Sequence, residues 1–161
     1  MSVDDVVGGS KKRILVVDGD GKRLKDAKRE LDSREGVAAV YATNYVAARV
    51  VLENKGSKLD GIITDLYFPC DDGTMWDHWD RTHGVPYGSG IVFYGITHDL
   101  PVVVCTAGPR SDFKICKEYL EIRQTYKDIL PFIEPEPQRF EEECLRKDWK
   151  RAYDALEAMM R

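Results

Sequence analysis

Five short apolar runs alternate with longer segments whose apolar residues recur at helical spacing. The runs cover residues 13–17, 37–42, 61–64, 101–105 and 128–133. Apolar runs this short and this continuous are typical of strands that are buried on both faces. Because one helical segment separates each run from the next, right-handed crossovers make the sheet parallel and place helices on both of its faces. The pattern therefore predicts a doubly wound α/β fold, a three-layer sandwich.

The helical segments are amphipathic, and several begin or end at recognisable caps. Asn44 is a plausible N-cap for the second helix, and Gly56 ends it. Three valines, Val46, Val50 and Val51, are expected to face inward from this helix. The expected inner side of the fourth helix is Phe113, Cys116 and Leu120, with Ile115 and Tyr119 as further candidates. The predicted helices cover a segment around Leu24, Ala27 and Leu31 and residues 45–54, 89–97, 112–124 and 138–160.

Length and composition indicate one domain. The chain has 161 residues, of which 43% are hydrophobic and 10% aromatic, which is enough for a single core. Residues 1–10 are predicted to be a loose leader, residues 11–161 one domain, and about residues 74–88, which lack any period, an insertion after the third strand.

The net charge and the cysteines indicate which classes of partner and which cellular compartment to expect. The net charge of −4 gives no electrostatic case for a nucleic-acid partner. Four cysteines without a CxxC pair favour a reducing, cytoplasmic compartment. No apolar run approaches the length of a membrane span, so we expect no membrane partner.

Acidic and hydroxyl residues follow three of the predicted strands. Asp18 and Asp20 follow the first strand, Asp65 the third and Thr106 the fourth. Because the carboxyl ends of parallel strands meet at one edge of a sheet, we expect these side chains to lie in one cluster. Clustered carboxylates repel one another, and a divalent cation relieves the repulsion. Oxygen ligands favour Mg²⁺, so the sequence predicts a magnesium site.

Three motifs, in this order along the chain, resemble the receiver domains of two-component response regulators: ILVVDGD, DLYFPCDDG and PVVVCTAG. The resemblance covers about residues 11–160 and implies a flavodoxin-like sheet of five strands in the order 2-1-3-4-5. It implies that Asp65 is the phosphoacceptor for a histidine kinase, that Thr106 is the hydroxyl that senses the phosphoryl group, and that the Tyr67 backbone is a metal ligand. The function expected from it is a stand-alone signalling module of a phosphorelay, which is not an enzyme.

Three positions depart from the pattern of the family. Gly19 stands where the family has the second of two consecutive acidic residues, which weakens the expected Mg²⁺ site. Alignment on Pro131 places Leu130 where the family has its phosphate-binding lysine, and Lys127 at the aromatic switch position. These departures indicate an atypical receiver. The alternative they raise is a pseudo-receiver that binds protein partners without phosphorylation.

Two other kinds of site share parts of these motifs or residues. VVDGDG and VVVCTAG also resemble motifs of haloacid dehalogenase-like phosphatases, which would make Asp18 a nucleophile and Asp20 a general acid beside Mg²⁺. No later strand ends in the lysine and acidic pair that this family needs. Cys70, His78 and His83 lack the paired spacing of a zinc site, which favours an incidental grouping.

Aromatic residues of the insertion are candidates for binding a protein partner. Trp76, Trp79 and Tyr87 lie in or beside its period-free stretch, and such residues are favoured anchors at interfaces. Packing within the insertion is the alternative explanation.

The last predicted helix is a second candidate surface. It would span about 23 residues, or about 34 Å, which exceeds the length of the strands it could cover. Leu156 and Met159 near its end are therefore expected to be exposed, unless the last turn simply frays. In receivers the fourth and fifth helices form the usual pairing face, so we expect a homodimer through residues 140–160.

Overall fold

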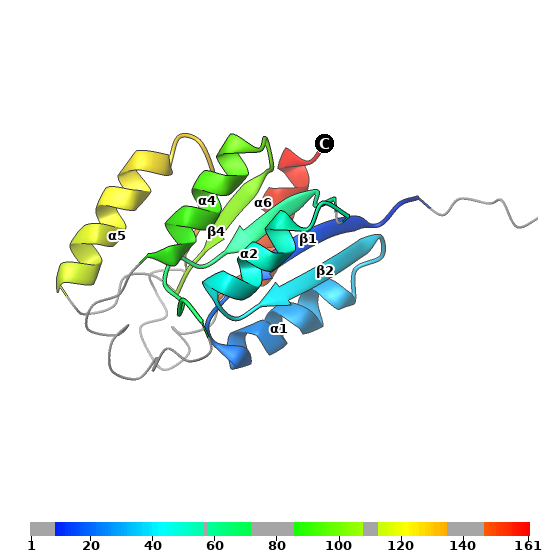
Figure 1. Cartoon of the computed structure of the whole chain (residues 1–161), viewed down its shortest axis with the longest axis horizontal. Helices are drawn as coiled ribbons and strands as arrows, with labels where there is room; N and C mark the ends of the chain where they lie inside the picture. Colours follow the sequence, from blue (N-terminus) through cyan, green and yellow to red (C-terminus); the bar gives the residue numbers. More distant parts are fainter. Residues whose placement is uncertain (1–8, 57, 72–85, 108–112, 135–146) are drawn as a thin grey trace, which may run out of the picture.

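A computed structural model describes residues 9–56, 58–71, 86–107, 113–134 and 147–161 (Figure 1). Five parallel strands form one sheet in the order β2-β1-β3-β4-β5. The strands are β1 (Lys12–Val17), β2 (Val37–Ala42), β3 (Gly61–Thr64), β4 (Val102–Cys105) and β5 (Phe132–Ile133). This confirms the predicted sheet and its strand order.

Helices cover both faces of the sheet, which confirms the three-layer sandwich (Figure 1). One face carries α2 (Tyr45–Glu53), α4 (Tyr87–Thr97) and α5 (Phe113–Tyr126), and the other carries α1 (Gly21–Asp32) and α6 (Trp149–Met159). Within the described residues, none of the helices combines the length and the apolar character that crossing a membrane requires.

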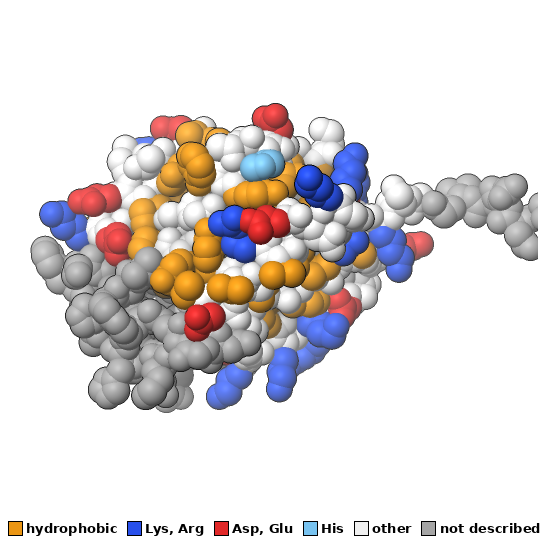
Figure 2. All heavy atoms as spheres, viewed as in Figure 1, with side chains coloured by type: hydrophobic (Ala, Val, Ile, Leu, Met, Phe, Trp, Pro, Cys, Tyr) orange, Lys and Arg blue, Asp and Glu red, His pale blue; other side chains and the backbone are white. Residues whose placement is uncertain are grey.

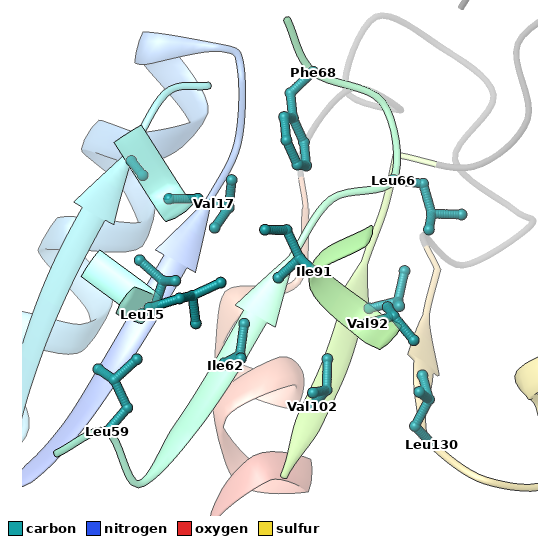
Figure 3. Packing of buried hydrophobic residues seen from close by; sticks show 14 of the residues in the cluster. Leu15, Val17, Leu59, Ile62, Leu66, Phe68, Ile91, Val92, Val102 and Leu130 are labelled. Carbon is teal, nitrogen blue, oxygen red and sulfur yellow. The ribbon is translucent and has the colours of Figure 1, made fainter. Parts of the chain in front are cut away.

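Alternate residues of the strands build the two cores. Leu15 and Ile62 pack toward α2 and α4, where Ile91 and Val92 meet them (Figure 3). Ile14, the neighbour of Leu15, points to the opposite face and packs with residues of α1 and α6. Each such side chain contributes about 1.5–3 kcal/mol when fully buried. The continuous apolar runs of the sequence thus reflect strands that are covered on both sides.

The predicted inner face of α2 was wrong at two of its three residues, since only Val51 packs against the core. Val46 and Val50 are 48% and 66% exposed, whereas Ala48 and Leu52 are buried against the sheet. Both pairs have the spacing of four residues that defines a helix face, but they lie about 200° apart around the axis. Apolar side chains on both sides of this helix made the two faces indistinguishable in the sequence.

Leu120 of α5 was also predicted to face inward, and it is 57% exposed. The adjacent Tyr119, a further candidate for that inner side, is buried and packs in the core under α4 and α5.

The predicted continuous helix over residues 138–160 was wrong. Asp148 has non-helical backbone angles and caps α6 by accepting a hydrogen bond from the Arg151 amide. The resulting helix has 11 residues, or about 16 Å, which matches the strands beneath it. Leu156 is fully buried and Met159 is 37% exposed. Leu156 is therefore a core residue rather than the partner-binding residue that was expected.

Candidate functional site

Asp18, Asp65 and Lys147 form a buried ion cluster at the carboxyl edge of the sheet. Asp18 follows β1, Asp65 follows β3, and Lys147 lies two residues before α6. The Lys147 Nζ atom lies 2.5 Å from Asp18 Oδ2 and 2.6 Å from Asp65 Oδ2. The side chains of Lys147, Asp18 and Asp65 are 0%, 1% and 7% exposed. One ammonium group therefore bridges two buried carboxylates.

Backbone amides hold the remaining carboxylate oxygens. The Asp20 amide donates to Asp18 Oδ1 at 2.8 Å, and the Leu66 amide donates to Asp65 Oδ1 at 2.7 Å. Both carboxylates thus accept from a backbone amide through one oxygen and contact Lys147 through the other. The turns that leave β1 and β3 fix the orientation of both groups.

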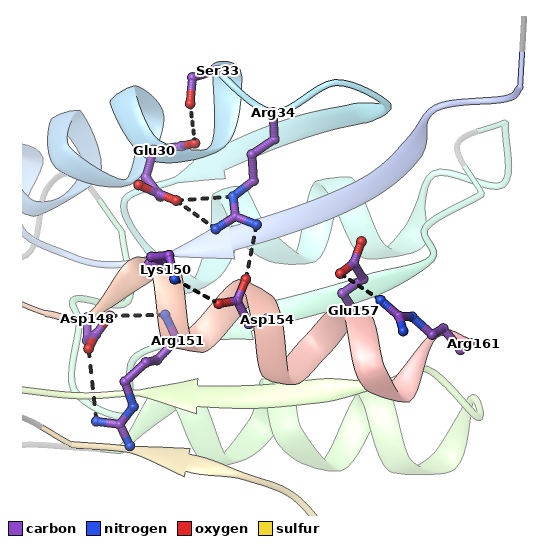
Figure 4. A network of polar contacts seen from close by, with 9 residues as sticks. All are labelled: Glu30, Ser33, Arg34, Asp148, Lys150, Arg151, Asp154, Glu157 and Arg161. Carbon is purple, nitrogen blue, oxygen red and sulfur yellow. Dashed lines mark hydrogen bonds and ion pairs between the residues drawn. The ribbon is translucent and has the colours of Figure 1, made fainter.

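The start of α6 positions Lys147. Asp148 caps this helix, and the buried Trp149 ring lies 5.6 Å from the Lys147 ammonium. The helix is held against the end of α1 by Arg34, which lies 3.1 Å from Asp154 and 2.7 Å from Glu30 (Figure 4). Lys147 therefore reaches the carboxylates from the start of a helix whose position is fixed by contacts with the end of α1.

The surroundings favour the charged form of Lys147. Burial alone would lower its pKa, but the carboxylates of Asp65 and Asp18 outweigh burial, so the pKa is raised and the group is an ammonium. Burial raises the pKa of Asp18, which Lys147 opposes and the charge of Asp65 reinforces. Burial also raises the pKa of the neighbouring Cys105 thiol to about 12, so this thiol stays protonated and is a poor nucleophile.

A second cation, Arg23 of α1, reaches the same site. Its Nη1 atom lies 3.9 Å from Asp65 Oδ2, and its Nε atom lies 3.8 Å from Asp20 Oδ2. The Arg23 side chain is only 11% exposed. Asp65 Oδ2 therefore faces two side-chain cations, one in contact and one at a slightly longer distance.

Asp20 caps the N-terminus of α1 and does not join Asp18 and Asp65 in a site of three carboxylates. Its Oδ1 atom accepts from the Lys22 amide at 2.8 Å as the N-cap of the helix, and its side chain is 41% exposed. Among the described residues, no three His, Cys, Asp or Glu side chains are placed to hold a metal ion together. The expectation that Asp18, Asp20 and Asp65 converge as one ligand set was wrong, because Asp20 is the N-cap.

Gly19 is required by the packing of the loop after β1. A Cβ atom at this position would lie 2.7 Å from Pro69 Cδ and 3.0 Å from Phe68 Cβ, which is closer than such atoms approach one another. The segment that follows β3 therefore excludes a side chain where the family has its second acidic residue. Among the described residues the donors do not fit Mg²⁺, since Lys147 lies between the two carboxylates and residue 19 has no room for a side chain.

The other residues expected at the site lie nearby. Thr106 follows the last residue of β4, is 4% exposed, and donates its amide to the Ile133 carbonyl. Because Val104 pairs with Thr64, Thr106 and Asp65 leave adjacent strands at the same edge. Tyr67 is half-buried, and its side chain packs against the core.

The alignment on Pro131 was wrong, because this proline precedes β5 instead of following it. Its carbonyl accepts from the Val104 amide at the start of the strand. Leu130 is accordingly a buried core residue that precedes β5, whereas the lysine position assigned to it follows that strand. Lys127 lies just after α5, and the aromatic residue on β5 is Phe132.

Sequence reasoning missed Lys147. The sequence pattern predicts a long helix that includes Lys147, and no motif marks this residue. The one available signal was Asp148, an N-cap residue type directly before the apolar face that starts at Trp149.

The predicted partner-binding aromatics are only partly described. The Tyr87 ring packs 5.4 Å from that of Tyr45 in the core, while Trp76 and Trp79 lie outside the described residues. His78 and His83, which the sequence groups with Cys70, also lie outside the described residues.

Exposed apolar side chains gather on the face made by α2, α4 and α5, which is the face shown in Figure 2. They are Val46, Val50, Phe93, Ile96 and Leu120. Met159 on α6 is exposed as well, at the opposite face of the sheet.

Solved structures of receiver domains are similar to this chain. One is a CheY-like response regulator receiver from Methanospirillum hungatei, with a TM-score of 0.55 and 16% identity over 93% of this chain and 97% of that one. Another is a response regulator receiver protein from Sinorhizobium medicae, with a TM-score of 0.57 and 18% identity over 93% and 94%. A third is RcsB from Salmonella enterica, bound to a promoter in the presence of phosphomimetic BeF₃⁻, with a TM-score of 0.53 and 17% identity over 91% and 99%.

No family model and no curated protein matches the sequence. The chain therefore has the fold of response regulator receiver domains, at a low level of sequence identity.

Proposed function

We propose that the chain is a receiver-like signalling module whose Asp65 accepts a phosphoryl group from a histidine kinase. The observation that carries the proposal is the contact of 2.6 Å between the Lys147 ammonium and Asp65 Oδ2. The lysine that was missing from the aligned position is thereby supplied from the start of α6. A carboxylate, a buried ammonium and a threonine at the next strand end are the groups that phosphoryl transfer to an aspartate needs.

The chemistry follows from the charges around Asp65. A carboxylate oxygen of Asp65 attacks the phosphorus of a phosphohistidine, and the P–N bond breaks with its electron pair left on the imidazole nitrogen. Because Oδ2 faces both Lys147 and Arg23, a phosphoryl group on this oxygen would lie between two cations. Fixed positive charge of this kind stabilises the charge on the transferred oxygens, and the Thr106 hydroxyl can donate to one of them.

The burial of Asp65 favours a second function, that of a pseudo-receiver that binds a protein partner without phosphorylation. Asp65 is 5% exposed, and both of its oxygens already have partners. The phosphatase alternative has less support. The nucleophile it needs, Asp18, is 1% exposed, accepts from a backbone amide through Oδ1 and contacts Lys147 through Oδ2.

For either receiver function the partner is a protein. The apolar side chains exposed on α2, α4 and α5 offer such a partner more contact area than α6, where Leu156 is buried. We place the module in the cytoplasm, without nucleic acid as its partner and without catalytic turnover of its own.

The deciding experiment is phosphorylation of the intact chain. Incubation with acetyl phosphate, or with an autophosphorylated histidine kinase, is expected to add one phosphoryl group in intact-mass spectra. Asp65→Asn should abolish the addition. Asp26→Asn, which changes a half-exposed carboxylate on α1, should leave it intact. A wild-type chain that gains no mass from either donor would favour the pseudo-receiver.

A further inference from the structure

We propose that Lys147 and Arg23 together supply the two positive charges that a divalent cation would otherwise bring to Asp18 and Asp65, so that this site operates without Mg²⁺. The part of the proposal that concerns phosphoryl transfer rests on the proposed function. The part that concerns metal binding does not, because it follows from the charges and the space around Asp18 and Asp65.

The first argument is the balance of charge. Asp18 and Asp65 carry two negative charges, and Lys147 and Arg23 supply two positive charges within 4 Å of Asp65 Oδ2 or in contact with Asp18. The family pattern instead puts a third acidic residue where this chain has Gly19, and that excess of negative charge is what a divalent ion neutralises. In this chain the two buried carboxylates are matched by the two cations, and the third carboxylate, Asp20, which lies 3.8 Å from Arg23, is 41% exposed and therefore screened by solvent.

The second argument is space. Lys147 Nζ lies 2.5 and 2.6 Å from one oxygen of each carboxylate. A magnesium ion shared by the same two oxygens would lie about 2.0–2.1 Å from each, so it would need the point that the ammonium now occupies. The loop after β3 closes the remaining position, because Pro69 lies where a side chain at residue 19 would begin.

The third argument is the response of the surroundings to an added ion. A divalent cation entering here would face two cations in a buried region, where charges are weakly screened. It could enter only by displacing the ammonium of Lys147, whose side chain is completely buried. Lys147 therefore competes with the metal for the same pair of carboxylates.

Metal titration tests the inference directly. Mg²⁺ binding to the full-length chain is measured by calorimetry, and Mn²⁺ binding by the loss of the free-ion paramagnetic resonance signal. The wild type is expected to show no binding at millimolar metal. Lys147→Met should bind at least tenfold more tightly, a gain of about 1.4 kcal/mol or more. Lys150→Met, which removes an exposed lysine three residues away, should behave as the wild type.

Arg23→Gln provides a second reading if Lys147→Met does not fold, as judged by circular dichroism. It removes one of the two positive charges from a position that is not part of the core, and it should also raise the affinity for metal. A wild-type chain that binds Mg²⁺ at millimolar concentration would overturn the inference. Foldable Lys147→Met and Arg23→Gln chains that gain no affinity would do the same.

Phosphorylation separates this inference from the proposed function. Acetyl phosphate should label Asp65 to the same extent in EDTA as in Mg²⁺. Labelling that needs Mg²⁺ would retain the proposed function and overturn the inference. If labelling fails under both conditions, the proposed function fails, and the metal titration still decides whether the two cations exclude a metal.

Discussion

Replacing Lys147 by Met should lower the free energy of unfolding by about 3–5 kcal/mol, which is the loss expected when a buried ion cluster is broken. The Met side chain keeps most of the apolar stem, so the change removes mainly the charge. Each carboxylate contact at these distances is worth about 6 kcal/mol of attraction at an effective dielectric constant of about 20. Most of that is offset by desolvation, and breaking a buried ion pair typically costs about 3–5 kcal/mol. This is a large part of the free energy of unfolding of an ordinary domain.

Urea denaturation followed by circular dichroism measures the loss. A matched control, Lys150→Met, breaks an exposed pair with Asp154 and should cost less than about 1 kcal/mol. Adding Asp18→Asn to Lys147→Met removes one of the two carboxylates left unpaired, and should recover about 1–3 kcal/mol. A loss no larger than that of the control, or no recovery in the double variant, would refute the buried cluster.

The pH dependence gives an independent check on the same group. Because the pKa of Lys147 is raised in the folded chain, its contribution is fully present below the ordinary lysine value of 10.5 and is lost as the pH rises through the folded pKa. The difference in stability between the wild type and Lys147→Met should therefore shrink in strongly alkaline solution. Raised tyrosine pKa values, as at Tyr41 and Tyr119, act in both chains and cancel from the difference.

Two further substitutions test the packing that shapes the site. Gly19→Ala should lower the free energy of unfolding by about 1–3 kcal/mol in urea denaturation, because the added Cβ meets Pro69. The control Gly21→Ala adds a Cβ that meets nothing within 4 Å and should be neutral or stabilising, so equal effects of the two variants would contradict the crowding at residue 19. Leu156→Ala should cost about 2–5 kcal/mol, and Met159→Ala less than about 1 kcal/mol, because only the first side chain is fully buried. If Leu156→Ala were harmless but changed the sedimentation of the chain, the helix would be an interface after all.

The strands were predictable because both of their faces are covered. Residues 61–64 were predicted as a strand and form β3 (Gly61–Thr64), and residues 101–105 were predicted as one and contain β4 (Val102–Cys105). Every residue of both strands is buried. A doubly covered strand is an unbroken apolar run, which needs no knowledge of its neighbours to be recognised. The inner face of α2 was not predictable in this way, because that helix carries apolar side chains on two sides and only the packed structure shows which side meets the sheet.

The carboxylates of the site were predictable for a related reason, and the lysine was not. Asp18 and Asp65 each follow a buried strand, so local pattern and topology alone place them at one edge. Lys147 is 129 residues from Asp18 along the chain, and nothing in its immediate sequence indicates that it is buried. A buried carboxylate needs a positive partner, but any segment that reaches the site can supply it.

The two cations of the site come from the two helices on one face of the sheet. Arg23 belongs to α1, and Lys147 lies two residues before α6. Arg34 joins the end of α1 to Asp154 on α6 and lies 4.4 Å from the Tyr153 ring, so the spacing of these helices is set by contacts away from the site. Because Asp65 comes from the sheet and both cations come from this helix pair, a movement of α6 along α1 would change the charge around Asp65. If Asp65 is phosphorylated as proposed, the phosphoryl group would attract both cations and thereby bias the position of α6.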